Sequence, residues 1–194
     1  MIDVLRFFVN MFFSVFYRVE IKGIENVPKK GSALICANHV GELDMFFIGF
    51  RIKRLVRWMA KEELFRNPVL GGLIKWLGAF PVKRGKADVR AIKTAFNLLD
   101  EGHIVGIFAE GTRTRGKAGV AKVNPGAAMF AVKKQVPVIP VGVEGRYKLF
   151  SKVRVVFGEP YYIEADKNKK YMNEEFTEIS RDIMKKVYGL LEGR

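Results

Sequence analysis

Short apolar runs alternate along this chain with segments that repeat apolar residues at helical spacing. Runs such as Ala33–Ala37 and residues 104–109 are too short for buried helices and suit strands that are buried on both faces. Residues 89–99 instead place apolar side chains on one face of a helix. Because this alternation is typical of βα units, the sequence predicts an α/β fold with a mostly parallel sheet flanked by helices.

The pattern predicts about seven strands in a single domain. The strands are expected near residues 17–22, 33–37, 55–60, 79–82, 104–109, 138–143 and 153–157. One helix is expected to begin after Asp88 and to end at Gly102, and a C-terminal amphipathic helix is expected to open at Asn173. No internal repeat or flexible linker divides the 194 residues.

The charge balance calls for an acidic partner. Lys and Arg number 34 against 20 Asp and Glu, which gives a net charge of +14. Nucleic acid, anionic lipid or a phosphate-bearing substrate could each be this acidic partner. The absence of a zinc-finger, RRM or KH motif disfavours nucleic acid. The single cysteine, Cys36, excludes a disulfide framework and a Cys-rich zinc site, favours a reducing compartment and is expected to be a buried apolar residue.

The N-terminus contains a segment rich in phenylalanine, residues 4–17 (VLRFFVNMFFSVFY). It is shorter than the roughly 20 apolar residues that span a bilayer, and no small-residue cleavage site follows it. Two interpretations remain: a helix docked on the core, or a helix lying in the plane of the lipid interface. The basic surplus favours the second, so residues 1–18 are predicted to form a membrane-associating helix and residues 19–194 the folded domain.

The segment Asn38-His39-Val40-Gly41-Glu42-Leu43-Asp44 follows the second predicted strand. Ligands of α/β sheets bind at the carboxyl ends of the strands, so His39 is placed for catalysis. If Gly41 allows a loop that turns into a helix, Asp44 can hold one imidazole nitrogen and leave the other as a general base. The alternative is that Asn38 or Asp44 caps the helix and His39 is an ordinary loop residue.

Two further segments place cations at strand ends. Lys83 and Arg84 end a short strand and suit phosphate binding, or form a solvated basic turn. The strand at 104–109 runs into Glu110-Gly111-Thr112-Arg113, which suits an anion-binding loop. His103, at the entry of that strand, is predicted to be structural. Residues 136–143 contain two prolines and are either a wall for an acyl chain or an edge strand.

In order, Asn-His-x-x-x-x-Asp, Gly-x-Phe-Pro-Val-Lys-Arg, Phe-x-Glu-Gly-Thr-Arg and Val-Ile-Pro-Val resemble the four motif blocks of the glycerolipid acyltransferase family. The blocks are most similar to those of the bacterial 1-acyl-sn-glycerol-3-phosphate acyltransferases, the PlsC enzymes. The resemblance implies transfer of an acyl group from acyl-CoA or acyl carrier protein to lysophosphatidic acid, which forms phosphatidic acid. It implies no cofactor and no metal.

The resemblance also implies roles for individual residues. His39 would be the general base and Asp44 its orienting acid. Substrate-binding residues would be Lys61, Lys83, Arg84, Glu110, Gly111, Thr112 and Arg113. Lys61 comes from an Ala-Lys-x-Glu-Leu stretch, and its alternative is a plain lysine at a helix start. Backbone amides near Gly41 or in the Gly111 loop are candidate oxyanion donors.

Two positions depart from the family pattern. Ala109 stands where proline is usual, and Lys83 replaces an acidic or polar residue, which adds charge near the phosphate. The choice of acceptor is therefore open, and glycerol 3-phosphate or another lysophospholipid is the alternative. A rival function of a different class is a non-catalytic lipid- or nucleic-acid-binding module. Peripheral or monotopic attachment to an anionic membrane surface, on the cytoplasmic face of the cell membrane, is the expected location.

Overall fold

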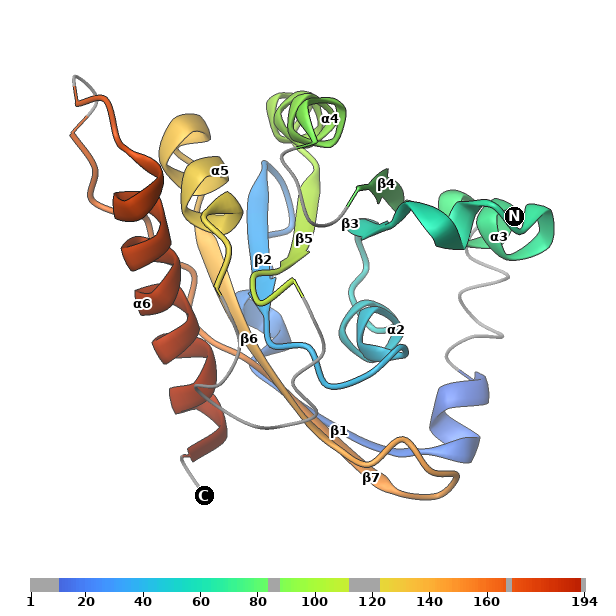
Figure 1. Cartoon of the computed structure of the whole chain (residues 1–194). Helices are drawn as coiled ribbons and strands as arrows, with labels where there is room; N and C mark the ends of the chain where they lie inside the picture. The colour runs from blue at the N-terminus through green and yellow to red at the C-terminus, as the bar shows by residue number, and fades with distance from the viewer. Residues whose placement is uncertain (1–10, 84–87, 112–122, 167–168, 193–194) are drawn as a thin grey trace.

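The computed structural model describes residues 11–83, 88–111, 123–166 and 169–192. Its centre is a seven-stranded sheet in the order β1-β7-β6-β2-β5-β3-β4 (Figure 1). The strands are β1 (Arg18–Lys22), β2 (Ala33–Ala37), β3 (Val56–Lys61), β4 (Phe80–Val82), β5 (Ile104–Phe108), β6 (Val138–Gly145) and β7 (Lys152–Phe157). Adjacent strands are parallel except β6 and β7, so the predicted α/β, mostly parallel sheet is confirmed.

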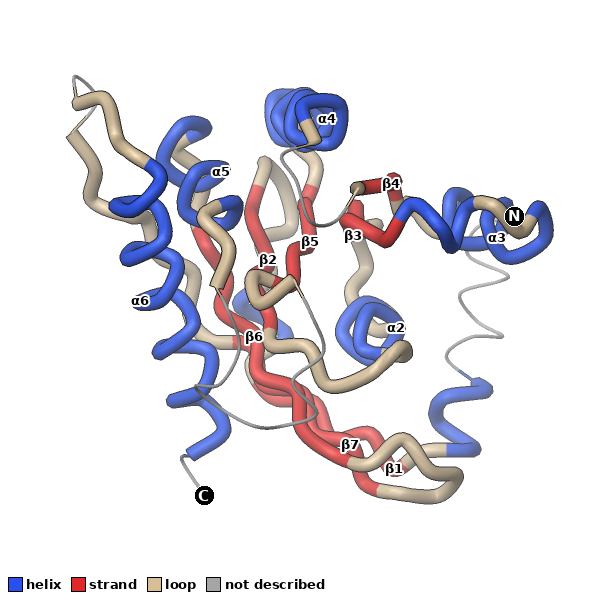
Figure 2. The backbone as a smooth tube through the Cα atoms, viewed as in Figure 1, coloured by secondary structure: helices blue, strands red, loops and turns tan. Residues whose placement is uncertain are grey.

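Helices cover both faces of the sheet (Figure 2). They are η1 (Ile24–Asn26), α2 (Asp44–Gly49), η2 (Glu62–Phe65), α3 (Pro68–Trp76), α4 (Val89–Asp100), α5 (Gly126–Lys134) and α6 (Asn173–Glu192). Alternate residues of β2 point to opposite faces: Ile35 packs in a core with α2 and α3, and Leu34 in a core with α4, α5 and α6. The result is one three-layered domain.

The predicted ends of two helices are confirmed. Asp88 is the N-cap of α4, and its carboxylate accepts hydrogen bonds from the amides of Arg90 and Ala91. Gly102 follows the C-cap of α4 with a φ of 81°, a left-handed conformation that suits glycine. α6 begins at Asn173, where it was expected.

The edge-strand interpretation of the proline-containing segment is wrong. β6 lies between β7 and β2, in the interior of the sheet. The Pro140 carbonyl accepts a hydrogen bond from the Gly158 amide, just beyond the end of β7. The N–H that proline lacks would point to the same side, outside the β6–β7 ladder, so Pro140 is tolerated there.

The N-terminal segment is helical over residues 11–16, and its first ten residues lie outside the described part of the chain. Phe13 is buried and its ring packs against Phe46, Phe47 and Phe50 of α2 and its end. Met11, Phe12 and Val15 on the other side of this helix are exposed. Among the described residues, no helix has the length and apolar character needed to cross a bilayer.

Candidate functional site

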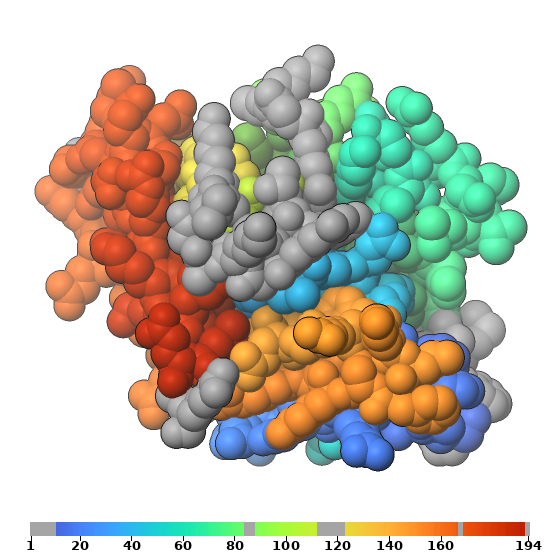
Figure 3. Space-filling view, turned by 60° about the horizontal axis from the view of Figure 1, so that its bottom comes forward, coloured from blue at the N-terminus to red at the C-terminus, as the bar shows by residue number. Residues whose placement is uncertain are grey.

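The predicted site residues that the structure describes gather along one edge of the sheet. Strands β2, β5, β3 and β4 are adjacent and parallel, so their carboxyl ends meet at that edge. His39 follows β2 and Glu110 follows β5. Lys61 ends β3 and lies opposite Val82, which is followed by Lys83. Figure 3 looks onto this edge, where the segment at the end of β2 (light blue) lies between β6–β7 (orange) and the η2–α3 region (teal).

His39 and Asp44 form a buried pair. The imidazole Nδ1 lies 2.5 Å from Asp44 Oδ2, and the two side chains are 7% and 0% exposed. The loop after β2 bends at Gly41 and enters α2 at Asp44, which brings the two side chains together as predicted. Because a carboxylate accepts, Nδ1 carries the proton in this contact and Nε2 is the basic nitrogen.

Asp44 accepts further hydrogen bonds that fix its carboxylate. The amides of Val40 and Gly41 donate to Oδ2 over 2.7 Å and 3.0 Å, and the Tyr147 hydroxyl donates to Oδ1. Burial, with Asp44 beside it, raises the pKa of Tyr147 far above its usual range, so its hydroxyl stays protonated. Four donors around one carboxylate hold it in a fixed orientation toward His39.

The alternative that Asn38 or Asp44 caps the helix is therefore wrong. α2 has no side-chain cap, and the Asp44 carboxylate turns back to the loop before it. Asn38 instead binds β6: its Nδ2 donates to the Val143 carbonyl and its Oδ1 accepts from the Val143 amide, both over 2.8 Å. This pair of bonds holds the end of β2 in place.

Glu110 lies behind His39. Its Oε2 accepts the His39 backbone N–H over 2.9 Å, and its Oε1 accepts from the Tyr188 hydroxyl of α6. The residue is 3% exposed. Glu110 was predicted in the acceptor-binding loop, and the structure places its carboxylate inward, where it positions the backbone of the histidine.

Three stacked rings extend from His39 across the sheet edge. The imidazole stacks on Phe108 of β5 at 4.2 Å between centroids, and Phe108 stacks on Trp58 of β3 at 4.9 Å. Gly106 makes room for this arrangement, because a Cβ there would lie 2.5 Å from the Trp58 ring. The stack fixes the imidazole plane and gives one side of it an apolar surface, next to which hydrogen bonds are strengthened.

Two glycines are required by the site for different reasons. Gly41 has no left-handed backbone, and a Cβ at this position would meet the Tyr147 ring at 2.6 Å. Gly111 has a φ of 66°, and a Cβ would meet Asn124 Nδ2 at 2.3 Å. Both backbone amides are already engaged: Gly41 N–H with Asp44, and Gly111 N–H with the Phe108 carbonyl at 3.0 Å. The amides of Gly41 and Gly111 themselves are therefore occupied within the protein, and the rest of the Gly111 loop lies outside the described residues.

The described cations of the site are exposed and paired with glutamates. Lys61 Nζ lies 3.3 Å from Glu63, and Lys83 Nζ lies 3.9 Å from Glu62. Their side chains are 46% and 43% exposed. β5 separates β3 from β2, so the Lys61 backbone is about 10 Å from that of β2, within reach of a phosphorylated substrate. The predicted residues Arg84, Thr112 and Arg113 lie outside the described residues.

Other candidates lie away from the site or remain inert. His103 is at the opposite edge, at the entry of β5, beside Glu101. Cys36 is fully buried, and burial raises the pKa of its thiol to about 12, so it is neither nucleophile nor ligand at neutral pH. In the described residues, no cluster of three His, Cys, Asp or Glu is placed to hold a metal ion.

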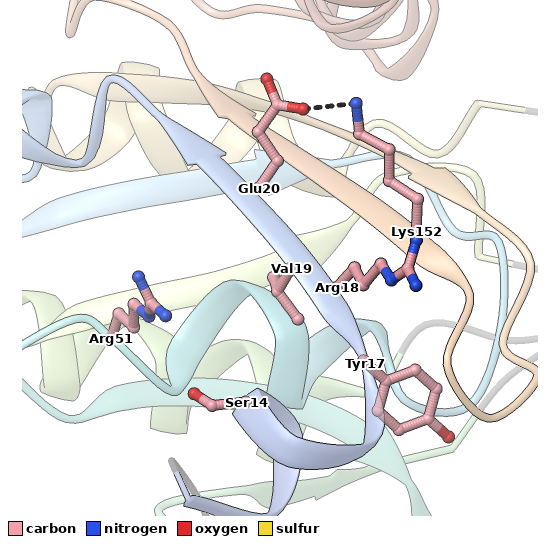
Figure 4. Close-up of a pocket in the computed structure, with 7 residues that line it drawn as sticks. All are labelled: Ser14, Tyr17, Arg18, Val19, Glu20, Arg51 and Lys152. Carbon is pink, nitrogen blue, oxygen red and sulfur yellow. Dashed lines mark ion pairs between the residues drawn. The ribbon is translucent and has the colours of Figure 1, made fainter.

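A hollow of about 530 Å³ lies along β1, beside the N-terminal helix (Figure 4). Its lining includes Ser14, Arg18, Arg51 and Lys152, and Glu20 pairs with Lys152 at 2.7 Å. None of the predicted site residues lines this hollow. It is therefore separate from the His39 centre.

Reasoning from the sequence missed two tyrosines of the site. Tyr147 belongs to the β6–β7 loop and Tyr188 to α6, each far along the chain from the residue it contacts. Tyr188 lies four residues after the buried Met184, and this helical spacing was the available signal that it faces inward. Tyr147 lies in a basic loop and had no comparable signal.

The chain is similar to known acyltransferases in sequence and structure. The model of the family described as Acyltransferase matches residues 18–144. The 1-acyl-sn-glycerol-3-phosphate acyltransferase of Bacillus subtilis is 35% identical over 150 residues, 74% of each chain, and that of Borreliella burgdorferi is 31% identical over 88% of this chain and 72% of its own.

A solved structure agrees with this. The 1-acyl-sn-glycerophosphate (LPA) acyltransferase PlsC of Thermotoga maritima matches with a TM-score of 0.73 and 28% identity, over 99% of this chain and 80% of the other. The fold, the buried His39–Asp44 pair and these similarities lead to one conclusion. The chain belongs to the Acyltransferase family.

Proposed function

We propose that this chain is a 1-acyl-sn-glycerol-3-phosphate acyltransferase. It transfers a fatty acyl group from the thioester of coenzyme A or of acyl carrier protein to the free hydroxyl of lysophosphatidic acid, and the product is phosphatidic acid. The observation that carries the proposal is the buried 2.5 Å contact between His39 and Asp44 at the end of β2, in a chain of this family. The names of the bacterial relatives support the choice of acceptor.

His39 acts as the general base. As the acceptor oxygen attacks the thioester carbonyl, Nε2 takes the hydroxyl proton and Asp44 stabilises the imidazolium through Nδ1. The tetrahedral intermediate then expels the thiolate, which receives the proton from His39. No residue of the protein is acylated, so a catalytic serine or cysteine is not needed.

Cations further along the sheet edge hold the phosphate of the acceptor. Lys61 and Lys83 form exposed ion pairs with glutamates, which contribute little to stability, so a phosphate can replace the glutamates. Arg84 and Arg113 complete the clamp by their sequence positions. Holding the phosphate there orients the hydroxyl toward His39, which supplies part of the rate through proximity.

The enzyme works at the surface of an anionic membrane. The helix at the N-terminus has an exposed apolar side formed by Met11, Phe12 and Val15, and the chain carries a net charge of +14. An in-plane helix beside a basic surface suits peripheral or monotopic attachment to the cytoplasmic face, with residues 1–18 as the attachment element. The acceptor and the product are both lipids of that membrane.

The experiment is a matched panel of donors and acceptors. Purified chain is incubated with acyl-CoA or acyl carrier protein donors and with lysophosphatidic acid, glycerol 3-phosphate or lysophosphatidylcholine in vesicles, and products are identified by mass spectrometry. Phosphatidic acid as the main product is expected. Acylation of glycerol 3-phosphate alone would transfer the proposal to that acceptor, and no acyl transfer to any acceptor would contradict it.

A further inference from the structure

The loop between β6 and β7 ends in an apolar tip. The Ser151 amide donates to the Lys148 carbonyl over 3.1 Å, which defines a β-turn with Leu149 and Phe150 at its centre. These two side chains are 59% and 61% exposed. Two adjacent large apolar residues at the tip of a turn contribute little to the core.

Phe150 also has an unfavourable backbone conformation. Its φ is 63°, the left-handed conformation that the third residue of such a turn usually fills with glycine or asparagine. A bulky aromatic residue is strained there. A strained and exposed phenylalanine indicates a function for the ring outside the fold.

The loop tip is continuous with the helix at the N-terminus. The Phe150 amide donates to the Phe16 carbonyl over 2.7 Å, and the two rings are 6.2 Å apart. Phe16 in turn packs on Phe12 at 4.8 Å. Leu149 and Phe150 therefore join the exposed side of the helix in one apolar surface, made by two segments far apart in the sequence.

Cations surround this surface. Arg146 and Lys148 are exposed on the loop, Lys152 is exposed where β7 begins, and Arg18 is exposed where β1 begins. Lys152 and Arg18 also line the hollow beside the helix (Figure 4). Apolar side chains ringed by lysine and arginine suit an anionic bilayer, where the rings enter the lipid and the cations meet the headgroups.

We infer that the Lys148–Ser151 turn is a second membrane-docking element, which binds anionic phospholipid together with the helix at residues 11–16. This inference rests on the proposed function in one respect, namely that docking serves to bring His39 to its lipid substrate. Tyr147 directly precedes the turn and its hydroxyl donates to Asp44, so this one residue connects the docking loop to the His39–Asp44 pair in space. Figure 3 shows the β6–β7 segment directly beside the end of β2.

The test compares vesicle binding of the full chain with that of a Leu149→Ser/Phe150→Asn variant. Asparagine accepts the left-handed backbone, so the variant should fold with an unchanged or higher Tm. Its partition onto vesicles of phosphatidylcholine and phosphatidylglycerol should fall about tenfold, since two apolar side chains no longer enter the lipid. The matched control is Tyr162→Ser, which removes an aromatic side chain that is 66% exposed. Tyr162 is away from the turn, because its neighbour Tyr161 pairs with Val138 at the start of β6, at the opposite edge of the sheet.

Activity is measured in parallel on two forms of the acceptor. The double variant should lose activity on vesicle-borne lysophosphatidic acid and keep it on a short-chain, water-soluble analogue, because it leaves the site intact. Vesicle binding equal to that of the native chain, or an equal loss in Tyr162→Ser, would overturn the inference. The inference would also be overturned if the native chain were a dimer that the double variant dissociates without any change in vesicle binding. The turn would then bind a second copy of the chain. If the native chain binds vesicles through the turn but acylates nothing, the proposed function fails and the docking element stands.

Discussion

The two ends of the site are built in opposite ways. At the end of β2, Asp44 is fully buried and accepts hydrogen bonds from His39, Tyr147 and two backbone amides. At the ends of β3 and β4, Lys61 and Lys83 are nearly half exposed and pair with glutamates at 3.3 Å and 3.9 Å. The geometry proposed for proton transfer is thus set before the substrate arrives, whereas the charges proposed to bind phosphate remain free to exchange partners.

The difference follows from what each end must do. General-base catalysis depends on angle and distance, and buried, fully hydrogen-bonded networks preserve both. Recognition of a phosphate depends on charge, and exposed lysines change rotamer at little cost. Substitutions at the His39 end should therefore lower kcat, and substitutions at the lysine end should raise KM.

The largest effect is expected for Asp44→Asn. An amide cannot stabilise the imidazolium as a carboxylate does, and it favours the wrong imidazole tautomer, so kcat should fall by about 10²–10⁴-fold. Steady-state kinetics with saturating acceptor measure this. A variant that folds, as judged by circular dichroism, and keeps native kcat would show that the pair is structural.

Tyr147→Phe should have an intermediate effect. It removes one donor from Asp44 without changing the size of the ring that packs on Gly41, so kcat should fall about tenfold with little change in KM. The matched control is Tyr161→Phe, a tyrosine outside the site, which should leave kcat unchanged. A rise in KM at constant kcat would instead assign Tyr147 to substrate binding.

Much of this fold could be predicted because local signals and packing agree. The apolar run of β2 has the predicted bounds, and Asp88 caps α4 as expected. The edge-strand interpretation of β6 failed because the position of Pro140 depends on where β7 ends, which is a property of the sheet and not of the segment. Local sequence patterns do not contain that information.

The contact between His39 and Asp44 was likewise predictable, but the hydrogen bonds that support it were not. His39 and Asp44 are five residues apart and need only one loop to meet. Tyr147 reaches Asp44 because β6 pairs with β2, and Tyr188 reaches Glu110 because α6 crosses that face of the sheet. Such contacts depend on topology over about a hundred residues, and no motif marks them.

Smaller effects are expected at the lysine end. Lys61→Ala and Lys83→Ala should each raise KM for the phosphorylated acceptor about three- to tenfold and leave kcat nearly unchanged, because each removes one exposed charge. Added salt should raise the native KM more than that of either variant. Lys185→Ala, an exposed lysine of α6, is the control. A loss of kcat at constant KM would place these lysines in the chemical step.

The smallest effect is expected in the stability of Tyr161→Phe. The Tyr161 hydroxyl is buried and has no hydrogen-bond partner among the described residues. Because leaving a buried polar group unpaired is costly, its removal should raise the free energy of unfolding by about 1 kcal/mol. Urea denaturation measures this. A loss of stability would reveal a partner for this hydroxyl and would weaken the variant as a control for Tyr147→Phe.

The most direct test of His39 as the general base compares acyl transfer to lysophosphatidic acid in vesicles by the native chain, by His39→Ala and by His103→Ala. His103 is the second histidine of the chain and lies at the opposite edge of the sheet. Phosphatidic acid is expected from the native chain and from His103→Ala, with a rate at least about 10²-fold lower from His39→Ala. Equal product from His39→Ala and the native chain would contradict the role of His39 as the general base.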